Sequence, residues 1–225
     1  MIALVPQHAN GKFAEMFFSF DGLDGAGKTT QIEMFCDWLL GAGHSLQRCV
    51  DPGSTPLGER VRPILLEDRN TRIDGTAEML LFMAARAQLV DEVIRPALLA
   101  GRTVVSDRYL LANVVYQGHA GGLEPADIWS VGKLATRGVL PDLTFVLDLP
   151  PVVAAQRMAR PLDRMETRGS EFQERLRAGF LAEAARQPEA IVLVDASQSI
   201  ADVQSEIRRH AELWLQRTGS APAGI

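Results

Sequence analysis

The stretch Gly22-Leu23-Asp24-Gly25-Ala26-Gly27-Lys28-Thr29 decides the fold of the 225-residue chain. It matches the pattern G-x-x-x-x-G-K-[ST], with an apolar run before it and a helical pattern after it. Glycines in such a loop let successive backbone N–H groups point at phosphate oxygens, and the helix start adds the positive end of its dipole. The sequence therefore predicts an ATP- or GTP-binding loop that ends at Thr30, against the alternative of a chance glycine-rich turn.

Outside the loop, short apolar runs bounded by turn residues alternate with longer helical patterns, which is typical of βαβ units. The predicted strands are residues 17–21, 46–50, 103–107, 143–148 and 191–195, and the predicted helices are residues 29–40, 76–100, 125–137, 171–187 and 200–216. Right-handed crossovers place helices on both faces of one parallel sheet and ligands at the carboxyl ends of its strands. The expected fold class is α/β, with a single P-loop domain over residues 16–217.

The two ends of the chain are expected to lie outside this domain. Residues 1–15 show no periodicity and are interpreted as a flexible extension, and residues 218–225 have the composition of a linker. Cys36 and Cys49 belong to no metal-binding motif and are interpreted as small buried hydrophobic residues.

Charge and hydropathy exclude several classes of partner. The formal net charge is −5 and the pI is about 5.4, which argues against a broad nucleic-acid or membrane surface. No apolar run approaches the ~18 residues of a membrane span, and the N-terminal run is too short for a signal peptide. We expect a cytoplasmic protein with small anionic ligands, no nucleic acid and no membrane partner.

Three side chains have expected roles around a bound nucleotide. Lys28 is expected to bridge the β- and γ-phosphates, and the Thr29 hydroxyl is expected to hold Mg²⁺. Three predicted strands end in aspartate, and such residues often serve only as caps. Asp107 is the metal candidate, because Arg108 follows it and the pair can serve metal and phosphate together.

Four separated blocks give the chain a family resemblance. They are FDGLDGAGKTT at residues 20–30, DPGSTPLG at 51–58, LFMAARAQ at 81–88 and DRYLLANVVYQG at 107–118. On these blocks, and on PDLTFVLD at 141–148 and LDRME at 162–166, the chain resembles the thymidylate kinases over about residues 16–216. The resemblance implies a five-stranded parallel sheet, a homodimer, and Mg²⁺- and ATP-dependent phosphorylation of dTMP to dTDP in dTTP biosynthesis.

The resemblance also implies the acceptor site. Phe82 stacks on thymine and Arg86 binds the 5′-phosphate of dTMP, and their i, i+4 spacing puts both on one helical face. From spacing alone, core packing is the alternative for Phe82. Arg108 is expected to reach the same phosphate, and two guanidinium groups suit a phosphate well.

Four further residues complete the implied dTMP contacts. Asn113, Tyr116 and Gln117 are placed at the base and sugar, with a solvated helix face as the alternative. Asp24 is implied to contact the 3′-hydroxyl of the sugar, although an aspartate in a loop also forms Asx turns.

The chain departs from the usual family pattern at several positions. Residues 50–54 read Val-Asp-Pro-Gly-Ser in place of the common Arg-Glu-Pro-Gly-Gly. A basic residue is therefore missing, and the acidic side chain, that of Asp51, is one carbon shorter than glutamate. Ala112 stands where serine is frequent, and Asp21 stands where glutamate is frequent.

A catalytic arginine is expected from a lid over about residues 157–169. Some relatives carry an arginine inside the phosphate loop, where this chain has Gly25. The lid segment is polar and interrupted by proline and glycine, and its arginines are Arg157, Arg160, Arg164 and Arg168. Arg164 is the first candidate, followed by Arg160 and Arg157, and a solvated charged loop is the alternative.

Two other functions are compatible with the loop. One is a different nucleoside monophosphate kinase or a nucleoside kinase, although a nucleoside acceptor needs a carboxylate base that an ionised acceptor phosphate does not. The other is a nucleotide-binding regulatory module without transfer activity.

Overall fold

The computed structural model describes residues 16–68, 70–158, 164–165 and 168–217. Its centre is one parallel sheet of β1 (Phe17–Gly22), β2 (Leu46–Val50), β3 (Thr103–Asp107), β4 (Leu143–Asp148) and β5 (Ile191–Asp195), in the order β2-β3-β1-β4-β5. The predicted α/β class and five strands are confirmed, and only β1 differs from its predicted bounds, by one residue. The predicted extension at residues 1–15 and the tail at 218–225 lie outside the described residues.

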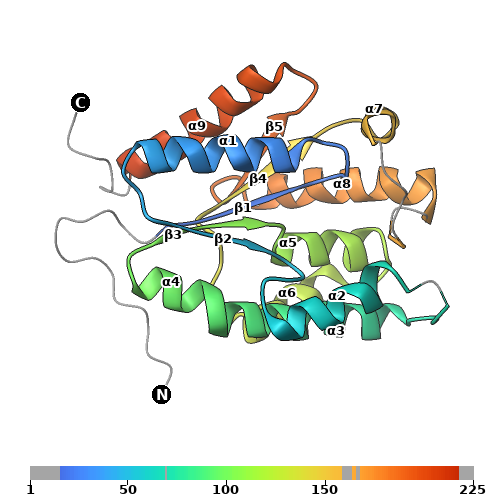
Figure 1. Cartoon of the computed structure of the whole chain (residues 1–225). Helices are drawn as coiled ribbons and strands as arrows, with labels where there is room; N and C mark the ends of the chain where they lie inside the picture. The colour runs from blue at the N-terminus through green and yellow to red at the C-terminus, as the bar shows by residue number, and fades with distance from the viewer. Residues whose placement is uncertain (1–15, 69, 159–163, 166–167, 218–225) are drawn as a thin grey trace.

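Helices cover both faces of the sheet (Figure 1). They are α1 (Lys28–Gly41), α2 (Pro56–Leu66), α3 (Gly75–Leu89), α4 (Arg95–Leu99), α5 (Leu110–Asn113), α6 (Pro125–Ala135), α7 (Pro151–Arg157), α8 (Ser170–Arg186) and α9 (Ile200–Arg217), with π-helical segments η1 (Val90–Ile94) and η2 (Val114–His119). Figure 1 shows α1 and α9 on one side of the sheet and α2 to α6 on the other. The predicted helix 76–100 corresponds to α3, η1 and α4 in succession, whereas the sequence analysis missed α2, α5, η2 and α7.

The strand register brings the phosphate loop and two other segments together at the carboxyl ends of the strands. Phe20 of β1 lies opposite Asp107 of β3, and Asp107 lies opposite Val50 of β2. The segments that follow these three strands therefore start side by side, as the rule for parallel sheets requires.

Aromatic packing holds β1 under α1. The ring centroid of Phe35 on α1 lies 5.2 Å from that of Phe18 and 5.4 Å from that of Phe20. All three side chains are fully buried, so each contributes about 1.5–3 kcal/mol of apolar burial to stability. The cysteines Cys36 and Cys49 are free and buried, as expected. No helix within the described residues has the length and apolar character needed to cross a bilayer.

Candidate active site

The loop between β1 and α1 has a backbone that only glycine adopts readily. Gly25 and Gly27 have φ angles of 85° and 94°. A Cβ atom at Gly25 would lie 2.2 Å from the carbonyl oxygen of Ala154. A side chain at Gly25 would require α7 to move, so the present position of α7 leaves no room for the loop arginine of some relatives.

The Lys28 side chain folds back over the phosphate loop. Its Nζ donates to the carbonyl oxygens of Gly22 at 3.2 Å and Leu23 at 3.0 Å, and to Asp24 Oδ1 at 3.3 Å. Burial, together with the nearby Arg108, lowers the pKa of Lys28, while Asp24 opposes the shift. These contacts hold the buried ammonium group against the loop.

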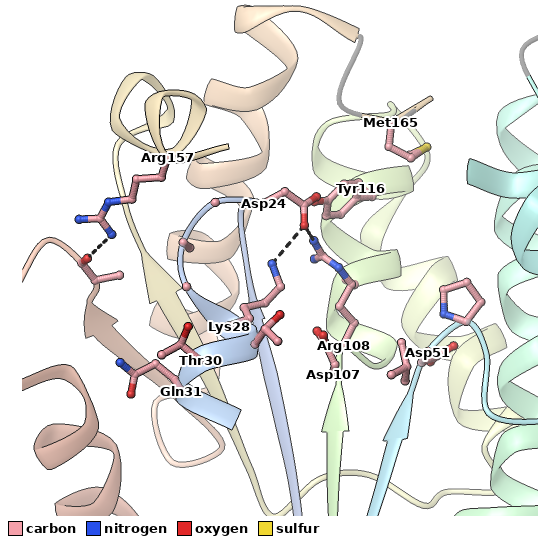
Figure 2. Close-up of a pocket in the computed structure, with 18 of the residues that line it drawn as sticks. Asp24, Lys28, Thr30, Gln31, Asp51, Asp107, Arg108, Tyr116, Arg157 and Met165 are labelled. Carbon is pink, nitrogen blue, oxygen red and sulfur yellow. Dashed lines mark hydrogen bonds and ion pairs between the residues drawn. The ribbon is translucent and has the colours of Figure 1, made fainter. Parts of the chain in front are cut away.

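Arg108 joins the loop to the end of β3. Its guanidinium donates to Asp24 Oδ1 at 2.8 Å and to the Gly22 carbonyl at 3.1 Å, and it lies over the Tyr116 ring at 5.2 Å. Figure 2 shows Asp24 between Lys28 and Arg108. Burial opposes ionisation of Asp24, but the charges of Arg108 and Lys28 outweigh it and lower the pKa of that carboxyl. Asp24 thus accepts from two cations, which is more than an Asx turn requires.

A cavity of about 840 Å³ opens beside the loop. Its lining includes the loop residues from Asp24 to Thr30, and the predicted Phe82, Arg86, Asp107, Arg108, Asn113, Tyr116, Gln117 and Arg157. Gly22 and Leu23 precede these loop residues in the sequence, and their carbonyl oxygens accept hydrogen bonds from Lys28. The volume suits small-molecule ligands, whose sites span roughly 300–1,000 Å³.

The inner end of the cavity is a buried polar network around Arg86. Its Nε donates to Asp51 Oδ2 at 2.5 Å and its Nη1 donates to Asn113 Oδ1 at 2.7 Å. Asn113 in turn donates to Gln117 Oε1 at 2.6 Å. Only 2% of each amide residue and 8% of Tyr116 is exposed, which excludes the solvated helix face for this segment.

The described part of the lid contacts two different regions. Arg157 Nη1 donates to the Ala196 carbonyl at 3.0 Å and lines the cavity on the side of Thr30, away from Asp51 (Figure 2). Arg164 instead pairs with Glu78 and donates to the Leu65 carbonyl at 2.9 Å. Arg160 lies outside the described residues.

Few side chains of the site can act as ligands for a metal ion. Thr29 is exposed at the start of α1, and both Thr29 and Asp107 line the cavity. Among the described residues, no group of three or more His, Cys, Asp or Glu side chains is placed to hold a metal ion. One hydroxyl and one carboxylate beside a phosphate loop fit Mg²⁺, which is usually bound by one or two protein oxygens together with water and substrate phosphates.

Three residues of the site escaped the sequence analysis as functional residues. Asp51 was noted only as a shortened acid, yet its carboxylate holds Arg86. Arg62 lines the cavity and donates to the Pro52 carbonyl at 2.6 Å. Glu78, one helical turn from Phe82 on α3, accepts from two lid arginines. The spacing of Glu78 and Phe82 on one helical face was the one signal available in the sequence.

The Asp21 side chain is fully buried next to the phosphate loop. Neither carboxylate oxygen has a hydrogen-bond partner among the described residues, and Arg108 Nη1 lies 3.7 Å from Oδ1. Burial raises the pKa of Asp21 to about 7, although Arg108 and Lys28 oppose the shift. The folded protein therefore binds a proton that the unfolded chain releases between about pH 4 and pH 7.

This proton predicts a pH-dependent stability in the nucleotide-free protein. Asp21 makes the free energy of unfolding fall as pH rises from about 4 to 7, because only the unfolded chain ionises over that window. Asp21→Asn should abolish this contribution and exceed the parent in stability by up to about 4 kcal/mol at pH 8, with a smaller difference toward pH 4. Urea unfolding of both proteins across this range measures the difference, and a difference independent of pH would contradict the assignment.

Fold and site together define a class. A parallel sheet in the order β2-β3-β1-β4-β5, a glycine-rich loop with Lys28 at its end, and an arginine-lined cavity beside the loop are features of a P-loop phosphotransferase for a small phosphorylated acceptor.

Comparisons with known proteins give the family. The family model described as thymidylate kinase matches residues 20–207. The thymidylate kinase of Chromobacterium violaceum is 43% identical over 203 residues, covering 89% of this chain and 95% of the relative. That of Symbiobacterium thermophilum is 40% identical over 203 residues, covering 90% and 95%. The crystal structure of thymidylate kinase from Ehrlichia chaffeensis superposes with a TM-score of 0.69 at 28% identity, over 86% of this chain and 97% of that one. The chain belongs to the thymidylate kinase family.

Proposed function

We propose that the protein transfers the γ-phosphoryl group of ATP to the 5′-phosphate of dTMP, with ATP on the loop and dTMP in the adjoining cavity. The observation that carries this proposal is the position of Arg108. Its guanidinium touches the loop at Asp24 and Gly22, next to Lys28, and also lines the cavity that contains Phe82 and Asn113. A phosphate bound there would face the end of the ATP chain.

Arg86 and Arg108 have different roles in the proposed acceptor site. Arg108 shares Asp24 with Lys28, so it is the arginine next to the transferring group. Arg86 is held by Asp51 and donates to Asn113, a residue that the family resemblance places at the base. This geometry favours Arg108 for the 5′-phosphate and Arg86 for the base end, in place of two arginines on one phosphate.

The protein supplies position and charge and needs no general base. The acceptor phosphate is already ionised at neutral pH, so the site has to align its oxygen with the γ-phosphate and neutralise charge. Lys28 and a lid arginine supply positive charge, and Phe82 and Arg108 hold the acceptor. Thr29 and Asp107 would hold Mg²⁺, which when bound neutralises charge on the β- and γ-phosphates. A homodimer and a cytoplasmic location, both expected from the sequence, stay predictions.

Removal of the Phe82 ring tests the acceptor site. Phe82 is half-buried: it packs against the cluster of Val61, Leu65 and Ala85, and it also lines the cavity. Phe82→Ala is expected to raise KM for dTMP and spare KM for ATP, because stacking on a base contributes about 1–3 kcal/mol. Phe82→Tyr, which keeps an aromatic face, should stay close to the parent. An equal loss with both substrates, together with a lower melting temperature, would mean that Phe82 serves only packing.

A coupled assay with ATP, Mg²⁺ and dTMP tests the function itself. Production of ADP that depends on dTMP supports transfer. A protein that binds ATP but releases no ADP with any nucleoside monophosphate would be a regulatory module.

A further inference from the structure

Glu78 lies behind the acceptor cavity and does not line it. It sits on α3 with 1% of its surface exposed. Its Oε1 accepts from Gln117 Nε2 at 2.9 Å, and its Oε2 accepts from Arg168 at 2.6 Å and also from Arg164. A buried carboxylate with three side-chain donors thus ties the lid to the helix that carries the cavity amides.

From Glu78 a chain of hydrogen bonds runs to Asp51 with only one possible direction. Gln117 donates to Glu78 and accepts from Asn113, and Asn113 accepts from Arg86, which donates to Asp51. A carboxylate only accepts and a guanidinium only donates. Glu78 at one end of the two amides only accepts, and Arg86 at the other end only donates, so these two residues fix which atom of each amide is oxygen and which is nitrogen.

We propose that Glu78 is a positioning residue that sets the base specificity of the acceptor site. It turns the Asn113 oxygen toward Arg86, so that the cavity presents an acceptor and a guanidinium donor side by side. That pair matches a pyrimidine with a carbonyl at C4 and N–H at N3, and it mismatches one with an amino group at C4 and a bare N3. The inference rests on the proposed placement of the base near Asn113.

The Glu78→Gln change would disturb the orientation of the Gln117 and Asn113 amides without changing the size of the side chain. Its single oxygen would be claimed by Arg164 and Arg168, which can only donate. Its NH₂ group would then face Gln117 and favour the reversed amide, which conflicts with Arg86 at the other end. The expected result is a mixture of amide orientations at the base.

The test compares kcat/KM for dTMP and dCMP in the parent and in Glu78→Gln. The dTMP/dCMP ratio is expected to fall about tenfold or more, mainly through a higher KM for dTMP, because a buried polar group facing the wrong partner is costly. Glu78→Asp keeps a group that only accepts and should retain most of the selectivity. Arg168→Ala leaves Gln117 bonded to Glu78 and should leave the ratio unchanged.

Glu183→Gln is the matched control for loss of a buried carboxylate. Glu183 on α8 is also fully buried and accepts from Trp129 at 3.0 Å, but it does not line the cavity. Its change should leave the ratio at the parent value even where it lowers the melting temperature. If Glu78→Gln does not fold, Gln117→Met breaks the same chain of hydrogen bonds and carries the same expectation.

Two outcomes overturn the inference in distinguishable ways. If Asn113→Ala raises KM for dTMP while Glu78→Gln keeps the parent ratio, Glu78 does not set specificity and the proposed base site stands. If Asn113→Ala leaves KM for dTMP unchanged, the base does not bind there, and the placement proposed for dTMP fails together with the inference.

Discussion

Replacement of Lys28 by alanine is expected to lower kcat by roughly 10²- to 10³-fold while the fold survives, because loss of one preorganised charge at a transferring group has effects of that size. The ammonium group is held by the Gly22 and Leu23 carbonyls and lies 3.3 Å from Asp24, within the charged cluster that also holds Arg108. Steady-state kinetics with ATP and dTMP measure kcat and both KM values.

A matched lysine makes the Lys28 experiment specific. Lys133 is exposed on α6 and does not line the cavity, so Lys133→Ala should behave as the parent. Melting temperatures of both variants check folding, since Lys28 is itself buried. Turnover near the parent value in a folded Lys28→Ala protein would mean that the loop does not serve catalysis.

Loss of the catalytic lid arginine is expected to lower kcat on the order of 10³-fold with little change in KM for ATP, as for other arginine fingers. The loop does not supply an arginine, because Gly25 stands at that position, and a side chain there would meet the Ala154 carbonyl. Among the described lid arginines, Arg157 lines the cavity, whereas Arg164 and Arg168 pair with Glu78. The structure therefore puts Arg157 before Arg164, the first choice from sequence, as the residue to test.

Single alanine variants at all four lid arginines decide the source of this charge. Arg209, exposed on α9, is the control, because an exposed arginine contributes little. One large drop in kcat identifies the arginine that reaches the γ-phosphate. Uniformly mild effects would show that the lid does not replace the missing loop arginine.

The sheet was predictable because its strands carry a strong local signal. Buried parallel strands are rich in apolar residues, as in β3 and β4, and the predicted residues 103–107 and 143–148 coincide with these strands. The predicted residues 46–50 and 191–195 also coincide with β2 and β5, although these edge strands are only partly buried and β2 includes Gln47 and Arg48. The missed helices lack such a signal. α2 is a continuous helix that contains Gly58 and Pro63, two residues that argue against a helix in the sequence. α5 and η2 are buried over Leu110 to Gly118 and so show no polar face for a 3.6-residue period.

The site was predictable only where local motifs carry it. The loop lies in one contiguous stretch, and its strand–loop–helix context is as predicted. The network of Asp51, Arg86 and Asn113 joins residues 35 and 27 positions apart, which only the folded sheet brings together. Spacing likewise cannot reveal that Glu78 meets Arg164 of the lid, 86 residues away.

A panel of nucleoside monophosphates, tested as acceptors with ATP and Mg²⁺, examines the central claim most directly. The panel contains dTMP, dUMP, dCMP, dAMP and dGMP, with thymidine as an unphosphorylated acceptor. The account predicts the highest kcat/KM with dTMP and no transfer to thymidine, because Arg108, which shares Asp24 with Lys28, is the group proposed to hold a phosphate on the acceptor. A higher kcat/KM with a purine monophosphate, or transfer to thymidine in place of dTMP, would contradict it.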